Sequence, residues 1–193
     1  MLRGDDQRVL SLSLLALGRP SLTGVIVERM YDEQPRLFRP LAGPRPAREP
    51  TVTWAALAPL VLRDLPEAIG RRLVEEHLLD PERFWLPVPP PSVPPTEPGF
   101  SLRDDHRLWI RRYWRGPTWI NAAWLAWLGL VRLGYAVQAE GLATRLAHAI
   151  HSNGLREYYH PRTGEGMGAL QFGWSTLILE MIDPDPRAAT SYV

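Results

Sequence analysis

The stretch from Trp119 to Leu133 contains almost no polar side chain beyond Asn121, and it constrains the fold more than any other part of the chain. Thr118 is a suitable N-cap before it, and Gly134 follows its last residue as a helix-ending glycine. A helix that is apolar on every face must be covered by protein on every face. We therefore predict a helix from Trp119 to Leu133 that is buried on all sides.

Apolar and amphipathic segments alternate along the chain. The apolar stretch is followed by an amphipathic helix over Ala136–Ile150, and an earlier apolar segment, Trp54–Leu62, is followed by an amphipathic one over Pro66–Leu79. A further apolar helix is expected over Phe172–Met181. This repetition of inner and outer helices is what a barrel of concentric helical hairpins requires. The fold class predicted from the pattern is all-α.

Capping residues mark where several helices should begin. Ser21 precedes a predicted helix over Leu22–Tyr31, Thr51 or Thr53 precedes Trp54, and Asp64 stands before the proline and glutamate that open the next helix. The acid and the hydroxyls can each accept a hydrogen bond from an otherwise unpaired main-chain N–H.

Two proline-rich segments, 34–50 and 84–100, interrupt the helices, because proline cannot donate a main-chain hydrogen bond. The first is predicted to be a surface loop. The second favours extended polyproline geometry, and two interpretations stay open. It forms either a rigid wall across one end of the helical domain or a ligand for peptide-binding modules.

Composition favours one soluble domain over residues 1–193. With 193 residues, 45 % of them hydrophobic, the chain can bury one sizeable core. The net charge of +1 argues against a nucleic-acid partner, and Asp104 and Asp105 dilute the arginines and aromatics of Ser101–Arg115 that could suggest single-stranded nucleic acid. No window approaches the roughly 20 apolar residues of a membrane span, so no membrane partner is predicted.

The chain has no cysteine, which excludes disulfides and thiolate metal sites and fits a cytoplasmic location. An apolar run near the start is expected to belong to a core helix over Gln7–Leu17 rather than to a signal peptide, since Asp5 and Asp6 spoil a cationic leader. No cofactor or metal is predicted. The histidines lack the spacing of metal ligands: His77, His106, His148, His151 and His160.

Two stretches combine aromatic side chains with a carboxylate, the mixture that sugar-cleaving sites use. The first runs from Tyr113 to Asn121 and the second from Gly154 to Gly166, where Glu157 stands beside tyrosines after a predicted helix. Aromatic faces suit the C–H-rich face of a pyranose ring, and a carboxylate supplies the acid or base that a glycosidic bond needs. Glu157 could instead be a solvated loop acid. Glu165 is a rival carboxylate, although its glycine turn favours a structural loop.

The same stretches, together with Phe172–Thr176, Leu79–Trp85 and Pro91–Val93, resemble the C-terminal part of glycoside hydrolase family 63. The resemblance is strongest to the branch containing mannosylglycerate and glucosylglycerate hydrolases, with trehalases and processing α-glucosidases more distant. It covers the chain from about Val27 to Ile182. His160 stands where an asparagine or aspartate is more usual.

The resemblance implies an (α/α)6 toroid and inverting hydrolysis of an α-glucoside or α-mannoside, which includes glycosylglycerates. It places Glu157 at the position of the general base. A small carbohydrate is the implied partner. The residues implied to bind it are Tyr113, Trp114, Arg115, Trp119 and Tyr158.

Half of the implied machinery has no match in this sequence. The family's general acid is an aspartate well upstream, and the acids to check here, Asp32, Asp104 and Asp105, stand in other contexts. The helices are too few to close six hairpins, so we expect an incomplete toroid. Two hypotheses follow: a hydrolase portion completed by an N-terminal partner segment, or a non-catalytic carbohydrate-binding or assembly module. Exposed apolar surface around Trp124 and Trp127 would promote self-association.

Overall fold

The computed structural model describes residues 13, 15–16, 18–39, 41–42, 47–48, 51–103 and 114–183. Most of the helix predicted over Gln7–Leu17 lies outside these residues, as does Tyr113. The described elements, in chain order, are α2 (Ser21–Met30), β1 (Tyr31–Asp32), β2 (Leu37–Phe38), β3 (Leu41–Ala42), β4 (Ala47–Arg48), the 3-10 helix η1 (Trp54–Val61), α3 (Glu67–Arg72), the π-helical η2 (Leu73–Leu78), α4 (Ile120–Arg132), α5 (Ala136–Asn153), β5 (Arg156–Tyr159), β6 (Gly166–Leu170), the 3-10 helix η3 (Gly173–Leu177) and α6 (Ile178–Ile182).

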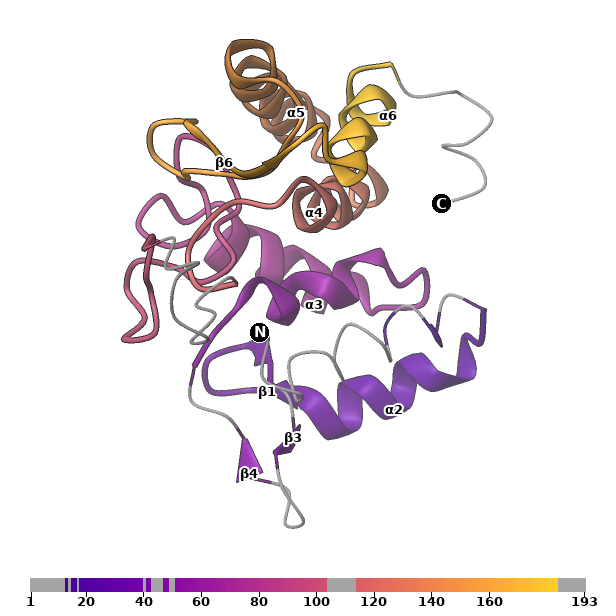
Figure 1. Ribbon diagram of the computed structural model, residues 1–193. Helices are drawn as coiled ribbons and strands as arrows, with labels where there is room; N and C mark the ends of the chain where they lie inside the picture. The colour runs from indigo at the N-terminus through magenta and orange to yellow at the C-terminus, as the bar shows by residue number, and fades with distance from the viewer. Residues whose placement is uncertain are drawn as a thin grey trace.

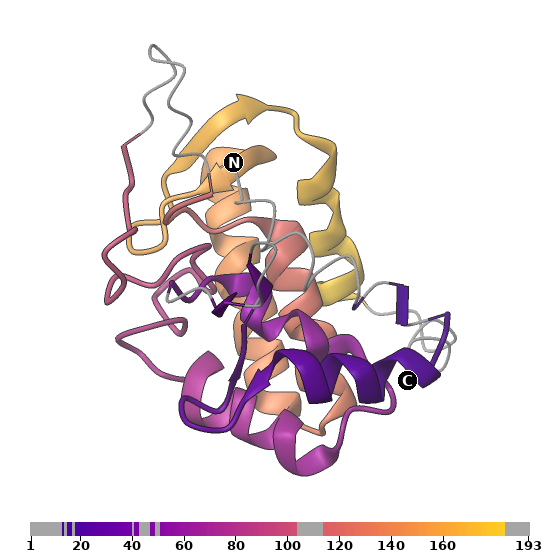
Figure 2. The ribbon, with the colours of Figure 1, turned by 90° about the horizontal axis from the view of Figure 1, so that it is seen from below.

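The helices lie one above another in a stack, and α4 is in its middle (Figure 1). It contacts η1 on one side and α5 and α6 on the other. Helix α2 crosses the outside of the stack on the side of η1 and α3, as the view from below shows (Figure 2). The described elements form such a stack and do not form a ring by themselves.

The apolar stretch of the sequence does become the central helix, but it is not buried on every face. Leu130 is fully buried, and a Cβ added at Gly129 would lie 2.5 Å from the Cβ of Leu60 on η1, so glycine permits the close contact of the two elements. Asn121, Trp124 and Leu128 are only half-buried. They recur at helical spacing and therefore lie on one face of α4. This face is less buried than predicted.

The other apolar segment is more tightly wound than predicted. Residues Trp54–Val61 form a 3-10 helix in which every residue is buried, and Pro59, which has no N–H to donate, lies inside it. The predicted cap is confirmed, because the Thr53 hydroxyl accepts a hydrogen bond from the Ala55 N–H at 3.3 Å. Its buried position confirms the expectation of an inner segment.

Two other predicted caps are wrong. Helix α2 begins at Ser21 with Pro20 at the N-cap position, and α3 begins at Glu67 with Pro66 at the N-cap position, so neither Ser21 nor Asp64 caps a helix. The predicted helix over Pro66–Leu79 appears as α3 and η2, with Leu73, His77 and Leu78 inward as expected. These inward side chains place it as an outer amphipathic element packed on the core.

The described chain is mostly helical, in line with the predicted fold class, and it also contains short antiparallel hairpins that the prediction did not include: β1–β2, β3–β4 and β5–β6. The last of these matters most for function. Helix α5 ends at Asn153, and Gly154 adopts a positive φ of 75° that turns the chain into β5. The residues expected at a helix end therefore lie in a strand, where tyrosines are favourable.

The C-terminal element is also less enclosed than predicted. The helix expected over Phe172–Met181 is divided into η3 and α6, and Leu179 is 63 % exposed. Exposed apolar surface was expected around Trp124 and Trp127, but Trp127 is buried and Trp124 is half-buried. The large apolar side chains exposed at this end of the described chain are Leu170, Trp174, Leu179 and Ile182.

No helix among the described residues combines the length and apolar character needed to cross a membrane.

Candidate active site

Glu157 lies in β5 and faces the β6 backbone. Its side chain is buried, at 9 % exposure, and its Oε2 accepts a hydrogen bond from the Ala169 N–H at 3.1 Å. The pairing of the two strands is irregular between Arg156 and Tyr158, so Glu157 sits at a bulge. Bulges re-aim side chains next to active sites. These contacts argue against the alternative that Glu157 is a solvated loop acid.

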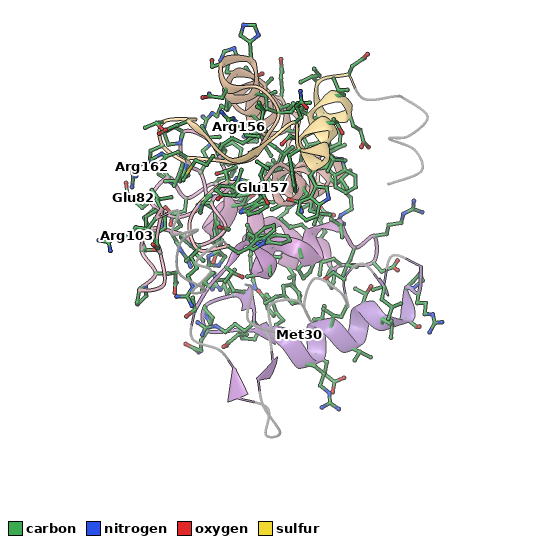
Figure 3. All side chains as sticks on the ribbon, viewed as in Figure 1. Met30, Glu82, Arg103, Arg156, Glu157 and Arg162 are labelled. Carbon is green, nitrogen blue, oxygen red and sulfur yellow. The ribbon has the colours of Figure 1, made fainter. Side chains whose placement is uncertain are left out.

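Gly168 allows β6 to approach this carboxylate. It has a positive φ of 68°, and a Cβ at this position would lie 2.7 Å from Glu157 Oε2 and 2.6 Å from Tyr158 Cε1. Glycine is thus required twice, for its backbone angle and for the absence of a side chain. Figure 3 shows Glu157 between the β5–β6 hairpin and the level of α4.

The predicted aromatic residues that the structure describes gather in one cluster. Tyr158 is its member next to Glu157, because a Cβ at Gly168 would lie 2.6 Å from Tyr158 Cε1 and 2.7 Å from Glu157 Oε2. The rings of Trp114 and Trp119 are stacked, with centroids 3.9 Å apart and an interplanar angle of 9°, and Trp119 contacts the Tyr158 ring at 4.8 Å. We name Trp114, Trp119 and Tyr158 the aromatic wall. Trp119 and Tyr158 are fully buried, whereas Trp114 is half-buried. Trp114 therefore carries the more accessible surface of the wall.

Trp174 is a member of the cluster that the sequence reasoning did not assign to the site. Its ring lies 6.5 Å from Trp114 and 6.1 Å from Trp119, and Phe172 meets it edge to face at 5.4 Å. Trp174 is 48 % exposed. The sequence did offer a clue to this residue, because Trp174 lies within the family-like motif Phe172–Thr176. Trp54, the first residue of η1, also reaches the wall, 5.8 Å from Trp114.

The turn that carries Trp114 and Trp119 is held from both sides. Thr118 exchanges main-chain hydrogen bonds with Tyr159 at 2.8 and 2.9 Å, which ties the turn to β5. Its hydroxyl donates to the Val88 carbonyl, so Thr118 does not act as the predicted N-cap, and α4 begins at Ile120. The proline-rich segment around Val88 is thereby joined to the turn before α4. Residues far apart in the sequence are joined here.

The arginines of the two motifs do not pair with Glu157. The Arg156 Nε donates instead to the Asn153 carbonyl at 3.3 Å. Arg115 is half-buried, and its carbonyl accepts from the Ser101 N–H at 2.6 Å. Within the described part of the chain, no ion pair to Glu157 is formed.

Tyr159 and Glu165 have structural positions. The Tyr159 hydroxyl donates to the Gly154 carbonyl at 2.7 Å and accepts from the Arg156 N–H at 2.9 Å, and burial raises the pKa of this phenol. Glu165 is exposed, and its carbonyl accepts from the His160 N–H in the loop between the strands. This agrees with the loop interpretation of Glu165. Among the described side chains, no group of three His, Asp or Glu could hold a metal ion.

Of the three acids considered for the second carboxyl role, one is described. Asp32 lies in β1, and its carboxylate is 3.8 Å from the Arg39 guanidinium. Asp104 and Asp105 lie outside the described residues.

Comparison with known proteins connects this geometry to a family of enzymes. The chain is 38 % identical over 96 residues to a mannosylglycerate hydrolase of Thermus thermophilus, covering 50 % of this chain and 20 % of the relative. It is 34 % identical over 127 residues to a glucosylglycerate hydrolase of Mycolicibacterium hassiacum, covering 65 % and 27 % of the two chains. The chain thus spans well under half of the length of these relatives.

Solved structures agree. The glucose complex of a GH63 mannosylglycerate hydrolase from Thermus thermophilus superposes with a TM-score of 0.71 at 26 % identity, over 90 % of this chain and 46 % of that one. Neutral trehalase from Saccharomyces cerevisiae gives a TM-score of 0.62 at 22 % identity, over 89 % and 31 % of the two chains, and supports the fold alone.

Residues 20–175 match the family described as the mannosylglycerate hydrolase MGH1-like glycoside hydrolase domain. This match includes Glu157 and every residue of the aromatic wall. The chain belongs to this glycoside hydrolase family.

Proposed function

We propose that this chain supplies the general base and part of the sugar-binding surface of an inverting α-glycosidase. The observation that carries the proposal is the environment of Glu157, a buried carboxylate held by a main-chain N–H and followed in β5 by Tyr158, whose ring contacts the stacked tryptophans. A general base must be held within hydrogen-bonding reach of the water that it activates. Anchoring at Oε2 restricts the carboxylate before substrate arrives.

The proposed sugar surface is formed by the tryptophans that retain exposed area. Trp114 and Trp174 offer apolar ring faces, while Trp119 stacks on Trp114 and is itself in contact with Tyr158. Arg115, which follows Trp114 in the sequence and is half-buried, is proposed as a sugar contact from the family resemblance. Tyr113 remains proposed as a sugar contact from the family resemblance alone.

The proposed substrate is a small α-glucoside or α-mannoside, with glycosylglycerates as the first choice. Solved relatives were bound to glucose and to D-glycerate. Inversion requires a second carboxyl group about 6.5–9.5 Å from the first, leaving room for water. We propose that another polypeptide segment supplies this general acid.

A non-catalytic carbohydrate-binding module is the second candidate. The tryptophan cluster favours it, since stacking on a pyranose needs aromatic faces and no second carboxylate. Both candidates predict sugar binding, and only the first predicts hydrolysis that depends on Glu157.

The test measures binding and hydrolysis separately on the full chain. Glucose and mannose are titrated while tryptophan fluorescence is followed. α-Glucosyl fluoride and α-mannosyl fluoride, whose fluoride leaves without the general acid that another segment would supply, are assayed for release of the free sugar. Glu157→Gln is the catalytic variant, and Glu165→Gln, an exposed loop acid in the same hairpin, is its matched control. Hydrolysis lost only in Glu157→Gln supports the glycosidase. Binding without hydrolysis supports the module, and the absence of sugar binding overturns both.

A further inference from the structure

Ser92 is a fully buried polar residue, at 1 % exposure, that touches three separate parts of the chain. Its carbonyl accepts from the Trp54 N–H at 3.0 Å, and its N–H donates to the Pro117 carbonyl at 2.9 Å. Its hydroxyl oxygen accepts from the Gly116 N–H at 2.9 Å. Ser92 thus links the start of η1, the proline-rich segment and the turn between Trp114 and Trp119.

From this arrangement we infer that Ser92 is a positioning residue for the aromatic wall: its hydroxyl holds the Gly116 turn so that Trp114 stacks on Trp119. The claim that Ser92 holds Trp114 against Trp119 does not depend on the proposed function. Only the expected effect of Ser92 on sugar binding rests on the proposed function.

The side chain of Ser92, rather than its backbone, carries the specific contact. Any non-proline residue at position 92 could make the two main-chain hydrogen bonds to Trp54 and Pro117. The bond to Gly116 requires an acceptor on the side chain, because a buried N–H that loses its partner has no water to replace it. Gly116 is itself buried.

The opposite side of the turn is closed. A Cβ at Gly116 would lie 2.8 Å from the Ser101 carbonyl oxygen and 3.1 Å from side-chain atoms of Phe100 and Leu102. The turn therefore packs closely against these residues as well as against Ser92. When the Ser92 acceptor is removed, the turn can relax only by shifting as a unit, and Trp114 moves with it.

Stacked indoles provide a direct readout of this geometry. Two tryptophan rings at 3.9 Å and 9° couple their electronic transitions and produce a far-ultraviolet circular dichroism couplet. Trp114→Phe and Trp119→Phe each remove one partner of this pair. The couplet is assigned to the pair when both variants lose it and Trp54→Phe and Trp174→Phe keep it. A role of Ser92 in general stability would lower the unfolding midpoint and leave the couplet of the folded protein unchanged.

The experiment compares Ser92→Ala with Thr53→Ala, which also removes a buried side-chain acceptor of a main-chain N–H but does not touch the turn. We expect Ser92→Ala to lose most of the couplet and to weaken glucose binding about tenfold, the effect of leaving one buried donor unpaired. Thr53→Ala should retain both. Ser92→Cys nearly preserves the volume and replaces the oxygen by a weak acceptor, so it carries the test if Ser92→Ala does not fold.

Each outcome decides the inference. A couplet that is unchanged in folded Ser92→Ala, or in Ser92→Cys, overturns it, and so does a wild-type chain without a couplet. A wild-type chain that shows the couplet but binds no glucose overturns the proposed function, while the loss of the couplet in the Ser92 variants still supports the positioning role.

Discussion

Gly168 and Glu157 lie so close that a methyl group on the glycine would be 2.7 Å from a carboxylate oxygen. The backbone of β6 can reach the acid only because this residue has no side chain. The contact connects a property of the sequence, a glycine in a short strand, with the position of the proposed general base.

Replacing Gly168 by alanine should displace Glu157 and destabilise the hairpin. Alanine is strained at a φ of 68° and clashes with Tyr158 as well, so we expect a loss of about 1–3 kcal/mol in the free energy of unfolding. Urea denaturation measures the loss. Gly24→Ala, in α2 with nothing within 4 Å, is the control and should be neutral or stabilising. Equal stability of the two variants would contradict the close approach.

Gly129→Ala should separate α4 from η1. The new methyl group would meet Leu60 at 2.5 Å between two buried elements, and overpacking of this kind costs about 1–3 kcal/mol. The unfolding midpoint of this variant is compared with that of Gly141→Ala, in α5 with open space around the glycine. A drop in the midpoint of Gly141→Ala as large as that of Gly129→Ala would argue against a specific clash.

His77 should make the folded state sensitive to acid. Its Nδ1 lies 2.8 Å from the Arg83 guanidinium, which can only donate, so the ring is neutral and accepts. Burial lowers the pKa of His77, and the positive charge of Arg83 lowers it further, although Glu76 opposes them. Below about pH 6.5 the unfolded chain therefore binds more protons than the folded one, and the free energy of unfolding falls by up to about 1.4 kcal/mol per pH unit.

The measurement is the urea midpoint of wild type and His77→Gln at about pH 7.5 and 5.5, values on either side of the unfolded pKa of histidine. Glutamine keeps an acceptor for Arg83 and cannot titrate, so its midpoint should change less between the two pH values. His148→Gln, at an exposed position, should behave like wild type. A His77→Gln midpoint with undiminished pH dependence would exclude His77 as the sensor.

The exposed apolar side chains near the C-terminal end should cause self-association. Leu179 is 63 % exposed and Ile182 is 53 % exposed on α6, which favours contact with another apolar surface. We expect Leu179→Glu to lower the weight-average mass in sedimentation experiments at high protein concentration. Val137→Glu, also on an exposed helical position, is the control. A wild-type chain that stays monomeric at all concentrations would refute this prediction.

Residue pattern alone determined the order of apolar and amphipathic elements. The inward positions of Leu73, His77 and Leu78 follow from periodicity, because one face of a helix must leave water. The motifs around Trp119 and Glu157 were likewise recognisable in the sequence, since the family resemblance depends on local runs of residues. Periodicity was sufficient for the first conclusion, and the resemblance of these motifs to a known family was sufficient for the second.

Only the tertiary structure decided how the motifs meet. Thr118 looked like a helix cap, yet it pairs with Tyr159, which is far along the chain, and Glu157 lies in a strand because a hairpin partner satisfies its backbone. Trp174 and Ser92 acquired their significance from neighbours that no local pattern predicts. Hydrogen bonds and ring contacts between distant segments depend on the packing of the whole core, and that packing is a property of the folded chain rather than of any short stretch.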